Sequence, residues 1–151
     1  MGWKAIAERN GLDPDMVRSA LRARGERFHV QMAWAEGVVA QAAAGMLLDN
    51  GFGRLMKPTP ERAFTQAPAL MGQGASRDVM CESLLRLDKA TDRAVRPYLR
   101  AVVHDEIVLS VPADSVEEWA EALRAAMTWE WRGVPILCDV SKPAFRWSGC
   151  K

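Results

Sequence analysis

The sequence predicts an α+β fold, with helices packed on a small antiparallel sheet. Apolar residues recur at helical spacing over much of residues 14–87 and again from residue 116. Two runs rich in β-branched residues, 101–103 and 107–111, are separated by three polar residues, which is typical of a hairpin. The chain has 151 residues, 49% hydrophobic and 26% charged, which is the balance of one globular domain and argues against a disordered chain.

The first fifty residues predict two helices. Asp13 is a plausible N-cap, because its carboxylate can accept hydrogen bonds from the first turn, and Pro14 fits the first helical position. A second helix is expected from about Arg27 to Leu48, ending at the stop signal 49–51. Its apolar stripe consists of Phe28, Met32, Ala35, Val39, Ala42 and Met46.

Residues 51–69 carry glycine and proline, and they predict an extended connection with room for a short hairpin. A third helix is expected from Gly74 to about Leu87. Its predicted buried face consists of Val79, Met80, Ser83, Leu84 and Leu87. The pattern over 92–99 does not distinguish a helix from a loop.

After the predicted hairpin, Pro112 ends the second strand. Either Asp114 or Ser115 is expected to cap a helix, and Glu117 and Glu118 suit the positive end of its dipole. The apolar residues of this helix are Val116, Trp119, Leu123 and Met127. Residues 134–140 predict a third strand.

The chain carries a formal charge of +1, but the charge is unevenly distributed. In the stretch 104–130 seven residues are acidic and Arg124 is the only Lys or Arg, whereas the first sixty residues are mildly basic. Three widely spaced cysteines form neither a zinc motif nor a disulfide framework, which indicates a reducing, cytoplasmic environment. We expect no membrane span and no secretory signal, because no apolar run is long enough.

Two adjacent carboxylates, Asp105 and Glu106, lie at the tip of the predicted hairpin. Like charges so close repel each other, and a divalent cation relieves that repulsion. Their oxygen ligands suit Mg²⁺, which takes one or two carboxylates and completes its shell with water and phosphate oxygens. The alternative is an ordinary solvated turn in which His104 only packs, and spacing alone favours that alternative.

The start of the third predicted helix carries a second candidate group. Gln73 and Arg77 are four residues apart, so they share one helix face, and Gly74 permits close approach of another backbone. Both side chains can donate to the minor-groove acceptors that every base pair presents, which would test pair geometry without reading sequence. The alternative is that Gln73 is a cap and Arg77 pairs with a carboxylate.

These two groups together resemble a known family. Val103-His104-Asp105-Glu106-Ile107-Val108, followed by Val111-Pro112, resembles motif C of family A DNA polymerases, the DNA polymerase I group. Residues 73–80, Gln-Gly-Ala-Ser-Arg-Asp-Val-Met, and then 84–88 resemble the Gln-Gly helix that precedes that motif. Residues 51–54 resemble the loop that joins fingers to palm, 60–64 a variant of phage-type members, and Trp147 the closing segment. The resemblance covers nearly the whole chain, and the motifs occur in the same order as in the family.

The resemblance implies template-dependent nucleotidyl transfer by a two-metal mechanism in DNA replication or repair. It implies that Asp105 binds catalytic Mg²⁺, that Glu106 is an auxiliary carboxylate and that His104 contacts the primer-terminal nucleotide. It also places Gln73 at the template-side minor groove and Arg62 near the primer–template. The role of Arg77 is inferred from helix spacing alone, since many members carry a small residue there.

The same resemblance shows what is missing. No Asp-Tyr-Ser occurs, so the second metal-binding aspartate of motif A is absent, and so is the nucleotide-binding fingers helix. We therefore expect residues 1–50 to be helices that follow the fingers helix and residues 51–151 to be the C-terminal palm portion. The expected partners are primer–template DNA, deoxynucleoside triphosphates and a second polypeptide that carries motif A and the fingers, with no membrane.

Two other functions compete with a polymerase half. The chain would act at most as a DNA-binding module if it were an inactive prophage-like remnant. An unrelated Mg²⁺-dependent phosphoesterase built on Asp105 and Glu106 is the weakest alternative, because the sequence offers no third acid at an obvious supporting position.

Overall fold

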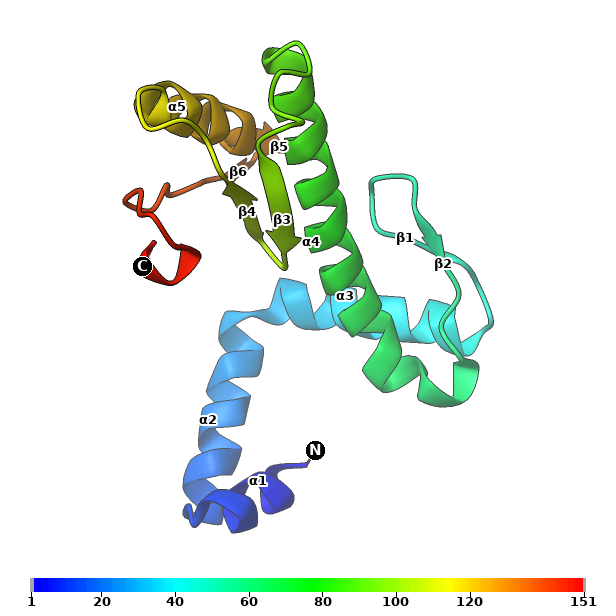
Figure 1. Ribbon diagram of the computed structural model, residues 1–151. Helices are drawn as coiled ribbons and strands as arrows, with labels where there is room; N and C mark the ends of the chain where they lie inside the picture. Colours follow the sequence, from blue (N-terminus) through cyan, green and yellow to red (C-terminus); the bar gives the residue numbers. More distant parts are fainter. Residues whose placement is uncertain (1, 151) are drawn as a thin grey trace. The chain divides into compact units, whose positions relative to one another are not determined.

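A computed structural model describes residues 2–150 (Figure 1). The chain divides into two compact units, the first ending at Gly72 and the second beginning at Gln73. The boundary falls inside one long helix, α4 (Ala63–Ala90), which contributes its first part to one unit and its remainder to the other.

The first unit is mainly helical. Its elements are α1 (Trp3–Asn10), α2 (Pro14–Arg27), α3 (His29–Ala43), β1 (Leu48–Asp49), β2 (Leu55–Met56), the 3-10 helix η1 (Pro60–Arg62) and the start of α4. The predicted cap of α2 is confirmed, since the Asp13 carboxylate accepts from the backbone N–H of Asp15 at 2.7 Å and of Met16 at 3.0 Å.

The helix predicted from about Arg27 to Leu48 is confirmed as α3, but it ends earlier than expected, at Ala43. Phe28 leaves the helical region of backbone space (φ −112°, ψ 36°) and separates α2 from α3. Gly45, with a φ of +74°, ends α3 in the left-handed conformation that glycine adopts without strain. Residues 48–49 then pair with 55–56 in a short antiparallel hairpin, which confirms the hairpin expected in this region but places it earlier.

The third predicted helix is confirmed as part of α4, but its predicted start near Gly74 is wrong, because α4 begins at Ala63 and has Pro68 in its interior. Proline there removes one helical hydrogen bond and normally ends a helix. Burial offsets this cost: Ala63 and Ala67 are enclosed in a cluster with Val38, Ala42 and Leu48. Packing against α3 therefore extends the helix beyond what local propensity indicates.

The second unit holds the remainder of α4, two antiparallel strand pairs and the helix α5. After α4 come β3 (Leu99–Val103), β4 (Glu106–Leu109), α5 (Val116–Met127), β5 (Trp129–Trp131), β6 (Val134–Ile136) and the 3-10 helix η2 (Trp147–Gly149). Strands β3 and β4 form one antiparallel pair and β5 and β6 another. The α+β class is thus confirmed, as helices with small two-stranded antiparallel sheets.

The predicted strand 134–140 is shorter than expected, and its partner is β5, which the sequence did not predict. The turn between them, Arg132-Gly133, has positive φ at both residues (51° and 80°), as a type I′ hairpin requires. Trp129 fixes β5 to α4, since its indole N–H donates to the buried Ser83 hydroxyl at 3.1 Å and the Arg86 guanidinium lies 4.5 Å from the ring centroid.

The core of the second unit joins α4, the hairpin and α5. Leu87 and Val95 pack with Ala126, and Leu109 of β4 lies against them. The predicted inner face of α4 is confirmed, since Met80, Ser83 and Leu87 are buried and Val79 and Leu84 are partly buried. Among the described residues, none of the helices combines the length and the hydropathy that crossing a bilayer takes.

Candidate functional site

The candidate site is the turn of the β3–β4 hairpin. Val103 pairs with Glu106, so the connection has two residues, His104 and Asp105, and Glu106 is already the first residue of β4. His104 has a φ of +54°. Asp105 has no positive φ, and positive φ at the first turn position alone is typical of a type II′ turn, which joins twisted strands tightly. The predicted hairpin is confirmed, and its turn presents His104, Asp105 and Glu106 together.

All three residues of this turn are exposed. Within residues 2–150 neither carboxylate makes a hydrogen bond or an ion pair, so both are open to an incoming ligand. The same described range contains no group of three or more His, Cys, Asp or Glu side chains positioned to share a metal ion. The turn therefore offers two carboxylates and not a complete metal cage.

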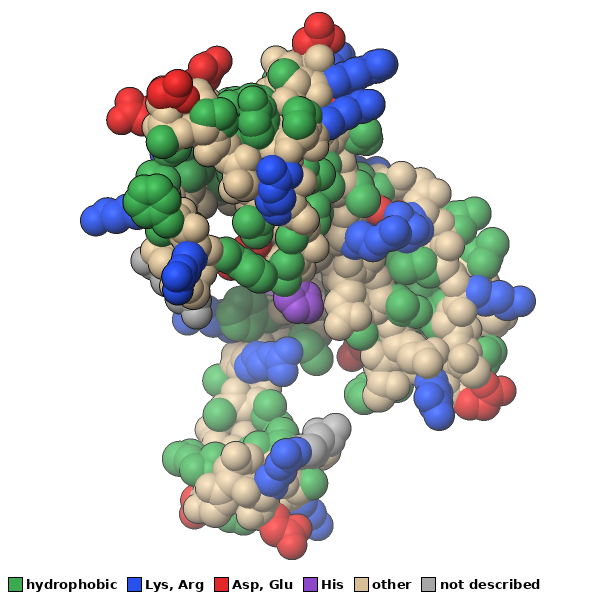
Figure 2. Space-filling model, in the orientation of Figure 1, with side chains coloured by type: hydrophobic (Ala, Val, Ile, Leu, Met, Phe, Trp, Pro, Cys, Tyr) green, Lys and Arg blue, Asp and Glu red, His purple; other side chains and the backbone are tan. Residues whose placement is uncertain are grey.

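The two acids stand at the end of a groove of about 800 Å³, which lies wholly in the second unit. Its lining comes from β4, from one face of α5 and from the stretch that follows β6. Figure 2 shows a hollow with hydrophobic side chains at its rim on this part of the surface. Asp139 also lines the groove, although the sequence analysis did not single it out because it lay within a predicted strand.

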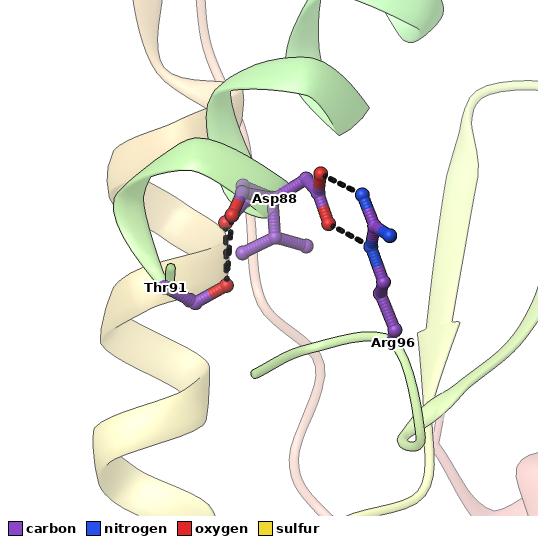
Figure 3. A network of polar contacts seen from close by, with 4 residues as sticks. Asp88, Thr91 and Arg96 are labelled. Carbon is purple, nitrogen blue, oxygen red and sulfur yellow. Dashed lines mark hydrogen bonds and ion pairs between the residues drawn. The ribbon is translucent and has the colours of Figure 1, made fainter. Parts of the chain in front are cut away.

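A charged contact fixes the reversal between α4 and β3 (Figure 3). Arg96 donates two hydrogen bonds to Asp88, from Nε and Nη2, each 2.8 Å long. Thr91 Oγ1 donates to the Leu87 carbonyl at 2.7 Å. The hydrogen bonds from Arg96 hold the pKa of Asp88 below its ordinary value of 3.8, and the same contact raises the pKa of Arg96. The pair thus orients the chain as it enters the hairpin.

The structure places the other predicted site residues in two groups. Gln73 and Arg77 are exposed on α4, in the second unit, and Arg77 makes no ion pair with any described residue. The alternative, in which Arg77 pairs with a carboxylate, is therefore wrong for the described residues. Arg62 is exposed in η1, in the first unit, so the structure does not group it with the turn.

Comparison with known proteins points to one class of enzyme. The chain is 32% identical over 119 residues to a DNA polymerase of Mycobacterium phage L5, which is 79% of this chain and 19% of that protein. It is 28% identical over 138 residues to a DNA polymerase of Mycobacterium phage D29, which is 91% of this chain and 22% of that protein. The chain is similar to part of these DNA polymerases.

A third relative is bacterial: DNA polymerase I of Lactococcus lactis is 26% identical over 137 residues, covering 81% of this chain and 15% of that protein. The chain therefore spans about a fifth of the length of the curated relatives it matches. No protein-family model matches it, and no solved structure does. The predicted resemblance to DNA polymerases is confirmed at this level, whereas family A and the individual motifs stay predictions.

Proposed function

We propose that the chain is the C-terminal palm portion of a family A DNA polymerase, active in template-dependent nucleotidyl transfer once a second polypeptide supplies motif A and the fingers. One observation carries the proposal: an exposed His-Asp-Glu turn at the end of a groove, in a chain similar to part of DNA polymerases. Since the chain spans about a fifth of those relatives, the second polypeptide is part of the proposal.

The location of the similarity supports this assignment. The match to the phage L5 polymerase covers 119 of 151 residues, so at most 32 residues lie outside it. Wherever that match starts, it includes residues 33–119, and with them the Gln-Gly helix and the acidic turn. The residues proposed to act are therefore within the stretch that is similar to a DNA polymerase.

The donor set at the turn fits Mg²⁺. Asp105 and Glu106 are exposed, carry hard oxygen ligands and make no hydrogen bond or ion pair with other described side chains. Magnesium is commonly held by one or two carboxylates, with water and substrate phosphates completing the shell. When bound, the ion would stabilise negative charge on the reacting oxygens. Asp105 would be its main ligand and Glu106 an auxiliary one, while the tight turn fixes where both carboxylates point.

The arrangement of α4 and the hairpin supports a shared DNA-binding role. Leu109 at the base of β4 packs against the buried cluster that contains Leu87 of α4, and β3 runs in the direction opposite to α4 (Figure 1). From Leu109 to Asp105 a strand advances about 14 Å. The same distance along α4 corresponds to about nine residues and returns from Leu87 to the level of Asp78, next to Arg77. Gln73 follows one turn further.

Each of the proposed site residues would have its own role. His104 would contact the terminal nucleotide of the primer beside the carboxylates. Gln73 and Arg77 would donate to minor-groove acceptors, which accept any correct base pair and so suit an enzyme that copies every sequence. Arg62 would bind the primer–template from the first unit.

Primer extension tests the proposal. The complementing chain is the part of the phage L5 DNA polymerase outside the matched residues, produced separately. We expect extension that depends on template and Mg²⁺ when the two chains are mixed, and its loss in Asp105→Ala. Asp114→Ala, which removes an exposed carboxylate outside the groove, is the matched control and should extend normally.

Each result has a definite meaning. If the Asp105→Ala variant extended the primer at the same rate as the original chain, the proposed role of the Asp105 carboxylate would be contradicted. Salt-sensitive duplex binding without extension in any mixture would instead identify a DNA-binding module. Nuclease activity that Asp105→Ala abolishes would identify a phosphoesterase.

A further inference from the structure

The stretch that follows β6 carries two aromatic side chains on the surface. Phe145 is fully exposed (105%), and Trp147 is 55% exposed. Within residues 2–150 neither ring stacks on another aromatic ring or lies beside a cation at interaction distance. Aromatic rings are the largest apolar groups that a chain can bury. Two such rings, two residues apart and both exposed, form a surface that a ligand with a flat apolar face could cover.

The charged side chains of the same stretch are all cationic. From residue 140 to residue 150 they are Lys142 and Arg146, and both are exposed. In the part of the chain that the structure describes, neither forms a salt bridge. Two unneutralised cations beside two aromatic rings favour a ligand that is anionic as well as flat, and disfavour a purely apolar one.

A closed local turn holds this stretch in place. The 3-10 helix η2 begins at Trp147, and the Gly149 N–H donates to the Arg146 carbonyl at 2.9 Å. The Cys150 N–H donates to the Trp147 carbonyl at 3.0 Å. A Cβ on Gly149 would lie only 3.0 Å from the Ala144 Cβ, so glycine lets the turn fold back closely on the residue that precedes the first ring. The red end of the ribbon in Figure 1 follows this turn.

The spacing of the two rings suits one nucleic-acid base. Arg146, which separates them, has an extended backbone (φ −138°, ψ 144°). An extended residue places its two neighbours on the same side of the chain, about 7 Å apart. Stacked bases follow one another at about 3.4 Å along a strand, so a base between two rings needs about the same 7 Å. Phe145 and Trp147 therefore have the separation of a base sandwich.

We propose that residues 142–147 bind single-stranded DNA, with one base stacked between Phe145 and Trp147 and with flanking phosphates paired to Lys142 and Arg146. Aromatic platforms combined with cations bind single strands without reading their sequence. In a duplex the faces of each base are already covered by its neighbours, so this site requires an unpaired strand. The site goes beyond the proposed function, since it needs neither the acidic turn nor a second polypeptide.

The position of this site gives it a use. Trp147 also lines the groove at whose end Asp105 and Glu106 stand. An unpaired strand stacked on Trp147 would therefore be held at the rim of the same groove. The chain would retain DNA there while no DNA end occupies the acidic turn.

The test uses a fluorescently labelled oligothymidylate of about 12 nucleotides, whose binding to the whole chain is measured by anisotropy without Mg²⁺, nucleotides or a second chain. Phe145→Leu keeps an apolar side chain but loses the planar ring, whereas Phe145→Tyr keeps the ring. Because Phe145 is fully exposed, neither change removes a buried contact. Phe28→Leu alters another exposed phenylalanine, in the first unit, and is the matched control.

We expect Phe145→Leu to bind the oligonucleotide at least about fivefold more weakly than the original chain. Phe145→Tyr and Phe28→Leu should bind it within about twofold of the original chain. Binding of the same oligonucleotide paired with its complement should not change in Phe145→Leu, because paired bases offer no free face.

The cations are tested by the salt dependence of binding. Losing two phosphate contacts should make the slope of log K against log salt concentration shallower by about 1.4, at about 0.7 for each contact with a single strand. Lys142→Ala combined with Arg146→Ala should show this change. Arg18→Ala combined with Arg22→Ala, which removes two exposed cations of α2 that are paired with carboxylates, should leave the slope unchanged.

Unchanged affinity of Phe145→Leu, equal losses in Phe145→Leu and Phe145→Tyr, or an unchanged slope in the double variant at 142 and 146 would each overturn the proposal. If Phe145→Ala binds the oligonucleotide normally but associates more weakly with the complementing polymerase chain, the rings form a protein contact and the proposal is wrong.

This outcome is separate from that of the proposed function. Oligonucleotide binding that depends on Phe145, without primer extension by the mixed chains, would retain the single-strand site and reject the polymerase. Primer extension by the mixed chains, with Phe145→Leu binding the oligonucleotide normally, would retain the polymerase and reject this site.

Discussion

Replacing Leu87 with alanine tests whether the hairpin is seated on α4 as described. The Leu87 side chain is fully buried (0% exposed) and lies between Val95 and Ala126. The substitution removes three carbon atoms, which is about 2.4 kcal/mol of transfer free energy at about 0.8 kcal/mol each. The cavity left behind raises the expected loss to about 3–4 kcal/mol. Marginal stability makes this a large share of the total.

The measurement is urea unfolding followed by tryptophan fluorescence, with the slope of the transition compared between variants. Leu85→Ala is the matched control, because Leu85 lies on the same helix but is 65% exposed, so its loss should cost less than about 0.5 kcal/mol. Equal destabilisation by the two variants would refute the packing on which the site's geometry depends.

Three further predictions concern the contacts around the site. Ser83→Ala should lower the free energy of unfolding by about 1 kcal/mol, because the Trp129 indole N–H loses its buried acceptor; urea unfolding measures this, and an unchanged midpoint would contradict it. Asp88→Asn should flatten the loss of stability on acidification: the lowered pKa of Asp88 stabilises the fold above pH 3.8, and this contribution disappears as the pH falls through the folded-state pKa. Thermal unfolding from pH 6 to about pH 2 checks this, and parallel curves would exclude it. Arg77→Ala should weaken duplex binding about equally for all sequences, because minor-groove acceptors are common to all base pairs; a change in sequence preference in a gel-shift titration would contradict that role.

The local signals in the sequence predicted the parts of the fold that depend on short-range chemistry. The Asp13 cap and the hairpin around His104 follow from side-chain hydrogen bonding and from β-branched runs that flank a polar turn, and both are confirmed. The predicted start of α4 was wrong. The free energy gained by burying Ala63 and Ala67 outweighs the cost of the proline and glycines that follow them in the helix. This burial depends on contacts with α3, whose residues lie outside the local sequence of α4, so helix propensity along α4 alone cannot predict it.

The groove could not be predicted for a related reason. The apolar stripe of α5 has the spacing of a helix packed in a core, and spacing does not tell whether the covering residues belong to the same chain. The predicted strand 134–140 included the right residues, but β6 covers only its first part, so 137–141 are left to line the groove. The acidic pair itself was visible in the sequence, whereas its position at the end of a groove required the structure.

The central claim is that the acidic turn binds a divalent cation next to DNA. Mn²⁺ titrated into the isotope-labelled chain with a primer–template duplex tests it directly, since the paramagnetic ion broadens the amide signals of nearby residues. We predict that broadening begins at His104, Asp105 and Glu106 and disappears in Asp105→Ala. Glu117 and Glu118, another adjacent and exposed acidic pair in the same unit, are the internal reference. Broadening that begins at Glu117 and Glu118, or equally at both pairs, would contradict the claim.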